Sequence, residues 1–383
     1  MDLIDRKLDV KHVKGLIDIF PVVAILGPRQ CGKTTLAKQF PYTHYFDLEN
    51  PRDLAMLEHP QLALDPLDGM IVIDEIQQKP DLFLLLRFLV DHHPEQRYLI
   101  LGSASRDLIR QSSETLAGRI GYFTLGGLRI SDVGTDSIRR LWLRGGLPRS
   151  YLIHDDEGSA IWRENYIATF LERDIPQLGI GIPAKTLGRF WTMLSHYHGQ
   201  MINYSELGRN FGISYMTARR YLDLLEGTFM IRQLRPWFQN VGKRLVKRPK
   251  LYFRDSGVFH TLIAVRESKD LLAHNKLGAS WEGFSLESVI RSIGKREEDL
   301  HFWSTHSGSE IDLFWQQNGK NWAVEFKYMD APKHTRSMAA VLEDLELEHL
   351  WIVYPGNSEY RLSARITVKP LANVADPWEY AIP

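Results

Sequence analysis

Short apolar runs alternate with longer stretches of helical periodicity in the first third of the chain. The apolar runs cover residues 22–26, 70–73, 98–101 and 122–125, and the helical patterns include residues 33–39 and 82–90. Continuous apolar runs of this length are typical of strands that are buried on both faces. The alternation therefore predicts an α/β fold with a parallel sheet covered by helices.

Beyond residue 140 the pattern changes several times. Glycines and a proline interrupt it at residues 145–148, and a polar helical run then covers residues 159–178. A compact block begins near residue 186, and turn-forming residues near 275 open a last unit. We expect four segments: an α/β domain over 1–135, a helical connecting segment over 136–185, a middle domain over 186–265, and a C-terminal α/β domain over 270–383.

The middle domain reads as two short helices followed by a strand. The first helix begins at Tyr204 and ends near Gly212, which supplies a turn, and the second covers residues 215–225. Residues 229–234 then have the pattern of a strand, so we predict a winged helix. Recognition helices contact DNA through residues early in the second helix. Here those residues are Thr217, Arg219 and Arg220.

A basic run extends from residue 227 to residue 254 and contains no acidic residue. Its basic residues are Arg232, Arg235, Lys243, Arg244, Lys247, Arg248, Lys250 and Arg254. Basic side chains mixed with aromatic ones are typical of nucleic-acid-binding surfaces. We predict that this segment binds DNA, with Lys243, Arg244, Lys247 and Arg248 as phosphate contacts. The alternative is a winged helix used only for domain or subunit contacts, with the basic run in solvent.

Two strand-like runs near the C-terminus flank Asn318-Gly319, which is the strongest short signal for a β-hairpin. With a two-residue loop, the strand count sets Asp312 opposite Glu325 and Glu310 opposite Lys327, all on one face. Like charges that lie directly opposite each other are unfavourable unless a positive charge lies between them. A divalent metal ion would supply that charge.

Glu282 is a candidate third acid for this cluster. It shares a predicted helix face with the apolar residues Leu286, Val289, Ile290 and Ile293. We predict Glu282, Asp312 and Glu325 as metal ligands. An ordinary ion pair between Glu310 and Lys327 is the alternative.

Composition and charge narrow the possible classes of protein. The chain has 383 residues, which suits two or three domains. Its 47 basic and 47 acidic residues leave no net charge, so any attraction for nucleic acid must be local. The only cysteine, Cys31, excludes an internal disulfide framework and predicts a reducing, cytoplasmic setting. Neither a signal peptide nor a membrane span is expected, since residues 1–10 are charged and Arg87 interrupts the most apolar stretch.

The segment from Gly27 to Thr34 has the phosphate-loop pattern, placed after an apolar strand and before a helix, as that motif requires. Glycines let backbone N–H groups face the phosphates of ATP, while Lys33 reaches the β and γ oxygens and Thr34 binds Mg²⁺. The predicted ATP-binding residues are Gly27, Pro28, Arg29, Gln30, Cys31, Gly32, Lys33, Thr34 and Thr35.

Two further apolar strands end in polar residues that complete the predicted ATP site. Asp74 and Glu75 follow residues 70–73, at the strand end where ligands of parallel sheets bind. Asp74 suits the Mg²⁺ shell, and Glu75 can polarise the attacking water. Ser103 follows residues 98–101 and is a candidate sensor of the γ-phosphate, although a simple strand-ending turn also explains it.

Together with the phosphate loop, the segments Asp74-Glu75-Ile76-Gln77 and Leu116-Ala117-Gly118-Arg119 make the whole chain resemble a family of bacterial AAA-type P-loop ATPases. The resemblance implies a homo-oligomer, with a hexamer among the candidate assemblies, in which Arg119 is an arginine finger that reaches a neighbour's ATP. An ion pair at the surface is the alternative role for Arg119.

The resemblance also implies a winged helix and a C-terminal restriction-endonuclease-like domain of unknown function. In that fold the acids Glu282, Asp312 and Glu325 bind Mg²⁺, and Lys327 positions or activates the attacking water.

Three functions are compatible with these features. The first is an oligomeric ATP-hydrolysing protein that binds DNA and drives DNA processing, with a metal-dependent nuclease-like C-terminal domain. The second is an ATP-dependent switch or scaffold that binds DNA or protein without cleavage. A small-molecule kinase would share the phosphate loop but leaves the basic run and the C-terminal acids unexplained.

Overall fold

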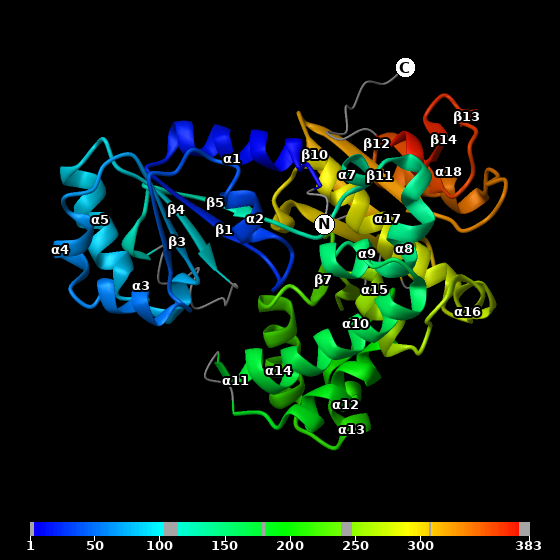
Figure 1. Cartoon of the computed structure of the whole chain (residues 1–383). Coiled ribbons are helices and arrows are strands. Elements are labelled where there is room, and N and C mark those ends of the chain that lie inside the picture. Colours follow the sequence, from blue (N-terminus) through cyan, green and yellow to red (C-terminus); the bar gives the residue numbers. More distant parts are fainter. Residues whose placement is uncertain (1–3, 103–113, 178–180, 239–246, 306–307, 375–383) are drawn as a thin grey trace. The chain divides into compact units, whose positions relative to one another are not determined.

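The computed structural model describes residues 4–102, 114–177, 181–238, 247–305 and 308–374 (Figure 1). The chain divides into two compact units. The first contains Met1–Leu128, Leu147–Arg149 and Gly227–Met230, and the second contains Arg129–Gly146, Ser150–Glu226 and Ile231–Pro383. No helix in the described ranges is both long and apolar enough to span a bilayer.

A five-stranded parallel sheet organises the first unit. Its order is β2-β3-β4-β1-β5, and every adjacent pair is parallel. The strands are β1 (Val22–Leu26), β2 (His44–Asp47), β3 (Met70–Asp74), β4 (Arg97–Gly102) and β5 (Ile120–Thr124). The predicted α/β fold with a parallel sheet is confirmed for this unit. Four of the strands, β1, β3, β4 and β5, coincide closely with the four apolar runs of the sequence.

Helices of the first unit bury their apolar residues against this sheet. They are α1 (Lys7–Ile19), α2 (Lys33–Ala37), α3 (Pro51–Met56), α4 (Pro60–Leu64), the short 3₁₀ helix η1 (Ile76–Gln78) and α5 (Leu82–His92). Leu82, Phe83, Leu86 and Leu89 of α5 recur at helical spacing and join strand residues in one core. The carboxyl ends of β1 and β3 therefore belong to a rigid, buried framework.

The second unit begins with helices. They are α7 (Ile130–Val133), η2 (Thr135–Ser137), α8 (Ile138–Arg144), α9 (Pro148–Leu152), α10 (Asp156–Thr169), the π-helical η3 (Phe170–Asp174), α11 (Ile175–Gln177) and α12 (Ala184–Ser195). The polar helical run of the sequence is therefore helical, with a π-helical turn inside it. Two further helices, α13 (Tyr204–Phe211) and α14 (Tyr215–Gly227), flank Gly212, whose φ of 71° ends α13 in a left-handed cap.

A nine-stranded sheet completes the second unit, in the order β13-β14-β12-β11-β10-β9-β7-β8-β6. Its strands are β6 (Gln200–Met201), β7 (Ile231–Pro236), β8 (Lys250–Phe253), β9 (Leu300–Ser304), β10 (Glu310–Gln317), β11 (Lys320–Phe326), β12 (Leu347–Tyr354), β13 (Tyr360–Ser363) and β14 (Ile366–Pro370). Because β7 pairs with β9, the strands predicted for the middle domain and those of the C-terminal domain form one continuous sheet.

Helices α15 (Ser256–Leu262), α16 (Ser268–Ala273), α17 (Leu277–Ile293) and α18 (Arg336–Asp344), with short turns η4 (Glu297–Asp299) and η5 (Leu371–Asn373), complete this unit. The predicted hairpin register is confirmed, with Gln317 paired to Lys320 and Leu313 to Val324. Asn318 and Gly319 have φ angles of 52° and 72°, as a tight two-residue hairpin turn requires.

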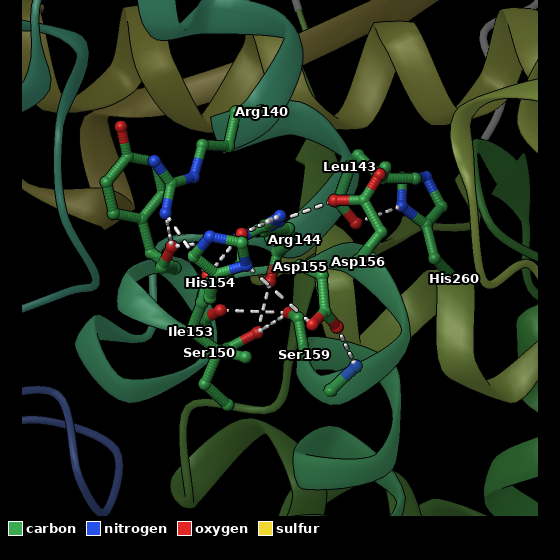
Figure 2. A network of polar contacts seen from close by, with 12 residues as sticks. Arg140, Leu143, Arg144, Ser150, Ile153, His154, Asp155, Asp156, Ser159 and His260 are labelled. Atoms are coloured by element: carbon green, nitrogen blue, oxygen red, sulfur yellow. Dashed lines mark hydrogen bonds and ion pairs between the residues drawn. The ribbon is translucent and has the colours of Figure 1, made fainter.

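A buried polar network fixes the first helices of the second unit (Figure 2). The Arg144 guanidinium lies 2.6 Å from the Asp156 carboxylate and also donates to the Ile153 carbonyl. Ser150 donates to the Arg144 carbonyl at 2.7 Å, and its hydroxyl lies 2.9 Å from that of Ser159. These contacts join α8, α9 and α10. They also give hydrogen-bond donors to backbone carbonyls that apolar packing alone would leave unsatisfied.

Candidate functional site

The loop between β1 and α2 has the backbone shape of a phosphate-binding loop. Gly32 has a φ of 101° and Gln30 a φ of 62°, so both lie in the left-handed region. A side chain at Gly27 could not fit, because its Cβ would lie 2.2 Å from the Leu125 carbonyl oxygen. These constraints explain two of the motif's glycines and curl the chain just before the N-terminus of α2.

Lys33 occupies the centre of this loop. Its side chain is buried, and the ammonium donates to the carbonyl oxygens of Gly27 and Pro28, at 3.1 Å each. The positive charge is therefore held within the concave side of the loop.

Asp74 gathers three donors at the carboxyl end of β3. Thr34 donates to Asp74 Oδ2 at 2.7 Å and Tyr45 donates to the same oxygen at 2.6 Å, while the Glu75 N–H donates to Oδ1 at 2.9 Å. A hydroxyl beside a carboxylate is a set of hard oxygen donors that suits Mg²⁺. The structure thus brings Thr34 and Asp74 together, as the sequence predicts.

Tyr45 was not among the predicted site residues. It lies on β2, which pairs with β3, and it reaches Asp74 from that neighbouring strand. Burial first, and then its contact with Asp74, raise the pKa of the Tyr45 hydroxyl, so it remains a donor at neutral pH. The short, half-buried strand carries no motif that would have identified this tyrosine.

Glu75 follows Asp74 in a left-handed conformation, with φ 55° and ψ 45°. Its carboxylate accepts a hydrogen bond from the Gln77 amide. Burial raises the pKa of Glu75, while the Lys33 charge and the Gln77 hydrogen bond work in the opposite direction. A partly desolvated carboxylate next to the phosphate loop is suited to polarise a water molecule.

The remaining loop residues have different surroundings. Arg29 forms an ion pair with Glu49 at 2.6 Å, Cys31 is completely buried, and Thr35 is exposed at the start of α2. Ser103 lies outside the described residues. Arg119 forms a two-point ion pair with Asp91 of α5, at 2.6 and 2.9 Å, so in this chain it has the surface partner named as the alternative to an arginine finger.

Arg6 connects the phosphate loop to the segment after β5. Its guanidinium donates to the Cys31 carbonyl at 2.9 Å and to the carbonyls of Gly126 and Gly127 at 3.0–3.2 Å. Asp9, one turn into α1, pairs with the same guanidinium at 2.7 Å. No sequence motif points to Arg6, because it lies in a charged segment that precedes the phosphate loop.

The predicted DNA contacts lie on the second unit. Arg219 and Arg220 are exposed on α14, and Thr217 is half-buried, with its hydroxyl 2.9 Å from that of Ser214. Lys247 and Arg248 are exposed just before β8. Lys243 and Arg244 lie outside the described residues.

Three residues of the basic run pair with acidic side chains and are not free surface charges. For these three residues, the prediction of a basic surface is wrong. Arg232 is buried and pairs with Glu287 at 2.5 Å, while Arg254 pairs with Glu297 at 2.8 Å. Lys250 is buried among acids of α17 and β10. Each partner lies more than 30 residues away in the sequence, so local charge counting could not reveal the pairing.

The C-terminal acids converge, but they converge on Lys250. Its ammonium lies 3.1 Å from Asp312 Oδ1 and 3.4 Å from Glu282 Oε1, and it also contacts Glu310. Glu282 and Asp312 are therefore neighbours, as predicted. The ion pair named as the alternative, between Glu310 and Lys327, is replaced by the contact of Glu310 with Lys250.

Glu325 and Lys327 form a separate pair on the same face of the hairpin, with Lys327 Nζ 2.5 Å from Glu325 Oε1. Burial and the nearby Asp312 raise the pKa of Glu325 to about 8. In the described part of the chain, no three His, Cys, Asp or Glu side chains are grouped so that they could hold a metal ion. The metal role of Glu282, Asp312 and Glu325 and the catalytic role of Lys327 stay predictions.

Comparison with protein families divides the chain into three parts. Residues 20–133 match a family described as an AAA domain. Residues 135–269 and 277–374 match two families, each described only as a domain of unknown function. The first match covers the phosphate loop, Asp74, Glu75 and Arg119.

Two mycobacterial relatives match almost the whole chain. They are the uncharacterized protein Rv2008c of Mycobacterium tuberculosis and the uncharacterized protein Mb2031c of Mycobacterium bovis, each 46% identical over 373 residues. The matched region covers 96% of this chain and 84% of each relative. Among solved structures, the Walker-type ATPase PABY2304 of Pyrococcus abyssi is 14% identical, with a TM-score of 0.45, over 68% of this chain and 96% of that one. The assignment of the first unit rests on the AAA domain match and the loop geometry.

Proposed function

The chain belongs to the family of the mycobacterial proteins Rv2008c and Mb2031c and carries an AAA-type P-loop ATPase domain, and from this premise we propose that it hydrolyses ATP with Mg²⁺ at the site built by Lys33, Thr34, Asp74 and Glu75. The observation that carries the proposal is the contact of Thr34 with Asp74, because Thr34 directly follows the lysine that donates to carbonyl oxygens of the phosphate loop. Phosphoryl transfer uses a lysine at the phosphates, oxygen ligands for Mg²⁺ and a group that orients water, and these residue types can supply them.

The side chains of this site have distinct tasks in hydrolysis. Lys33 exchanges its bonds to Gly27 and Pro28 for phosphate oxygens, and the loop N–H groups bind the same phosphates. Thr34 and Asp74 would hold Mg²⁺, which neutralises charge on the β and γ oxygens when bound. Glu75 accepts a hydrogen bond from the attacking water and aligns it.

Two variants test this proposal. Lys33→Ala should lose both nucleotide binding and turnover, because it removes the positive charge that faces the phosphates. Glu75→Gln should bind ATP normally but fail to hydrolyse it, because only the water-polarising group is lost. Binding is measured with a fluorescent ATP analogue and turnover as phosphate release. Normal turnover by Glu75→Gln at saturating Mg²⁺ would remove Glu75 from the mechanism.

We further propose that the protein assembles into homo-oligomers in which Arg119 leaves Asp91 and reaches the ATP of a neighbour. The exposed position of the Arg119–Asp91 pair supports this, because water can replace Asp91 at little cost. Arg119→Ala should then lose hydrolysis but keep affinity for ATP, whereas Asp91→Asn should remain active. Mixing Arg119→Ala with Lys33→Ala should restore part of the activity. A fully active monomer would contradict the role in trans.

We propose DNA as the ligand of the second unit, bound through the exposed side chains of α14 and of the segment before β8. Arg219, Arg220, Lys247 and Arg248 are exposed, unlike the buried Arg232 and Lys250, and the contact of Arg219 with Asp223 is long, at 3.9 Å. The chain has no net charge, so its attraction for DNA must come from a set of exposed basic side chains such as these four.

The position of Lys250 favours one of the two DNA-related functions, the ATP-dependent switch or scaffold, over ATP-driven cleavage. The acids that a nuclease would use to bind metal already surround an ammonium group. The nuclease remains testable. Incubation with Mg²⁺ or Mn²⁺ and single-stranded, duplex and branched DNA should give no nicking. If the wild type nicks DNA and both Asp312→Ala and Lys327→Ala do not, cleavage becomes the favoured function.

A further inference from the structure

The acidic cluster of the second unit is built around one buried lysine. Lys250 is only 3% exposed, and three carboxylates from two elements contact its ammonium: Glu282 from α17, and Glu310 and Asp312 from β10. The face of the Phe302 ring lies 5.6 Å from the same nitrogen. An ammonium has three N–H donors, and three carboxylates accept them here.

Both oxygens of Asp312 and one oxygen of Glu282 are already engaged by donors. Asp312 Oδ1 accepts from Lys250 at 3.1 Å, and its Oδ2 accepts from the Phe326 N–H at 3.0 Å. Glu282 Oε1 accepts from the Tyr252 hydroxyl at 2.5 Å as well as from Lys250. A magnesium ion needs carboxylate oxygens about 2.1 Å away, and it would compete with these N–H and O–H donors for the same oxygens. The donor set therefore does not fit a bound metal.

We propose that the Lys250 ammonium is the resident cation of this cluster and that it excludes a divalent metal from Glu282 and Asp312. The lysine supplies a positive charge to Asp312 from the side of Glu282, whereas Glu325 has its own partner in Lys327. It also joins β8 to β10 and α17. In this view the cluster stabilises the second unit, and its integrity does not depend on metal. The proposal is independent of ATP hydrolysis by the first unit.

Charge balance in the cluster is consistent with this role. Burial works against the charged form of Lys250, but the negative groups around it raise its pKa well above the usual range, so it remains an ammonium. Burial and the neighbouring Asp312 raise the pKa of Glu282 to about 7.

Metal binding by the full-length protein tests the proposal directly. Mn²⁺ binding is measured by electron paramagnetic resonance without nucleotide, for the wild type and for Asp312→Asn. Both should bind the same amount, because any Mn²⁺ at the phosphate loop is common to the two proteins. A wild-type site that Asp312→Asn abolishes would overturn the proposal.

Removal of the lysine provides the second arm. Lys250→Ala should melt at lower temperature than the wild type, because three carboxylates lose their counter-ion. Mn²⁺ at about tenfold above its dissociation constant should then raise that melting temperature by roughly 3–6 °C, and the double variant with Asp312→Asn should show no such rise. Lys320→Ala removes an exposed lysine of the same sheet that pairs with Glu348, and it should melt like the wild type with or without Mn²⁺. If Lys250→Ala folds without any loss of melting temperature, the lysine is not the counter-ion and the proposal fails. If the variant does not fold, the wild-type arm decides.

Discussion

Arg6 illustrates how one side chain can shape a site to which it contributes no phosphate contact. Its planar guanidinium reaches three backbone carbonyls in two segments, and Asp9 holds it in place. One of these segments is the phosphate loop, and the other leads to Leu128, after which the chain enters the second unit. The side chain therefore couples the shape of the loop to the segment that follows β5.

We predict that Arg6→Lys weakens ATP binding roughly tenfold, equivalent to the loss of one or two hydrogen bonds from a charged group. Lysine keeps the charge but cannot present the guanidinium fork to several carbonyls at once. The measurement is the KM for ATP together with the dissociation constant of a fluorescent analogue. The neighbouring Lys7→Ala, an exposed position, is the control and should behave as wild type. Equal affinities in Arg6→Lys and wild type would show that the loop keeps its shape without the clamp.

The pKa of Glu75 gives a pH-dependent prediction. Burial raises this pKa, and Glu75 must be ionised to polarise water. As the pH falls, hydrolysis should therefore be lost at a higher pH than it would be with an ordinary glutamate. Gln77→Ala removes a hydrogen bond that lowers the pKa, and it should move the acidic limb of kcat further toward neutral pH. The exposed Gln78→Ala is the matched control. Identical acidic limbs for wild type and Gln77→Ala would contradict the assignment.

At the residue scale, the sequence revealed groups whose chemistry depends on neighbours along the chain. Lys33, Thr34 and the strand-ending Asp74 lie in a motif with fixed local geometry, and the structure brings them together as expected. Arg232 and Lys250 failed as predicted surface charges because their acidic partners lie in α17 and β10. The charge pattern of a segment does not determine whether those charges meet solvent or a distant acid.

At the element scale, α14 and the segment before β8 form the proposed DNA surface. We predict that replacing Arg219, Arg220, Lys247 and Arg248 with glutamine flattens the slope of log affinity against log salt by roughly three to four, since each lost phosphate contact contributes about 0.9. Fluorescence anisotropy with duplex DNA at several salt concentrations measures the slope. A control variant replaces four other exposed basic residues of the same unit: Arg266, Lys269, Arg296 and Lys320. Equal slopes for the two variants would place DNA elsewhere.

Helix α15 packs so closely against α8 that a glycine is required at the contact. A Cβ on Gly257 would lie 2.1 Å from the Arg144 carbonyl oxygen, which belongs to the network of Figure 2. Gly257→Ala should therefore lower the free energy of unfolding of the second unit by about 1–3 kcal/mol.

Gly278, in α17, is the matched control, because nothing lies within 4 Å of its added Cβ. Gly278→Ala should stabilise the unit by up to about 1 kcal/mol through helix propensity. Urea unfolding followed by circular dichroism compares the two variants. An unchanged midpoint for Gly257→Ala would mean that the two helices can move apart at no cost.

Predictability at the element scale depended on the strength of local signals. Asn318-Gly319 fixes a two-residue turn, and that turn alone sets the register of β10 against β11. Strand β2 was missed because three of its four residues are only half-buried, and His44 and Asp47 at its two ends leave no apolar run. The pairing of β7 with β9 could not be predicted either, since it joins Arg235 to His301 across 66 residues and has no signal in either strand.

At the scale of the whole molecule, the two units have separate cores. The first core consists of strand and helix residues between Val22 and Ile120, and a second one is centred on β10, β11, β12 and α18. The buried histidines of the described residues, His198, His260 and His349, all belong to the second unit. Separate cores predict that each unit responds to its own ligand and to its own substitutions.

We therefore predict that ATP stabilises the first unit alone. In the Glu75→Gln variant, which should bind ATP without consuming it, ATP and Mg²⁺ at about 100 times the dissociation constant should raise the melting temperature of the first unit by on the order of 10 °C. The second transition should not move, because Lys33, Thr34, Asp74 and Glu75 of the proposed ATP site all belong to the first unit. Differential scanning calorimetry resolves the two transitions, and Lys250→Ala identifies the second one by lowering it selectively. If ATP raises both transitions together, the units unfold cooperatively, and the nucleotide state of the first unit is then energetically coupled to the proposed DNA-binding unit.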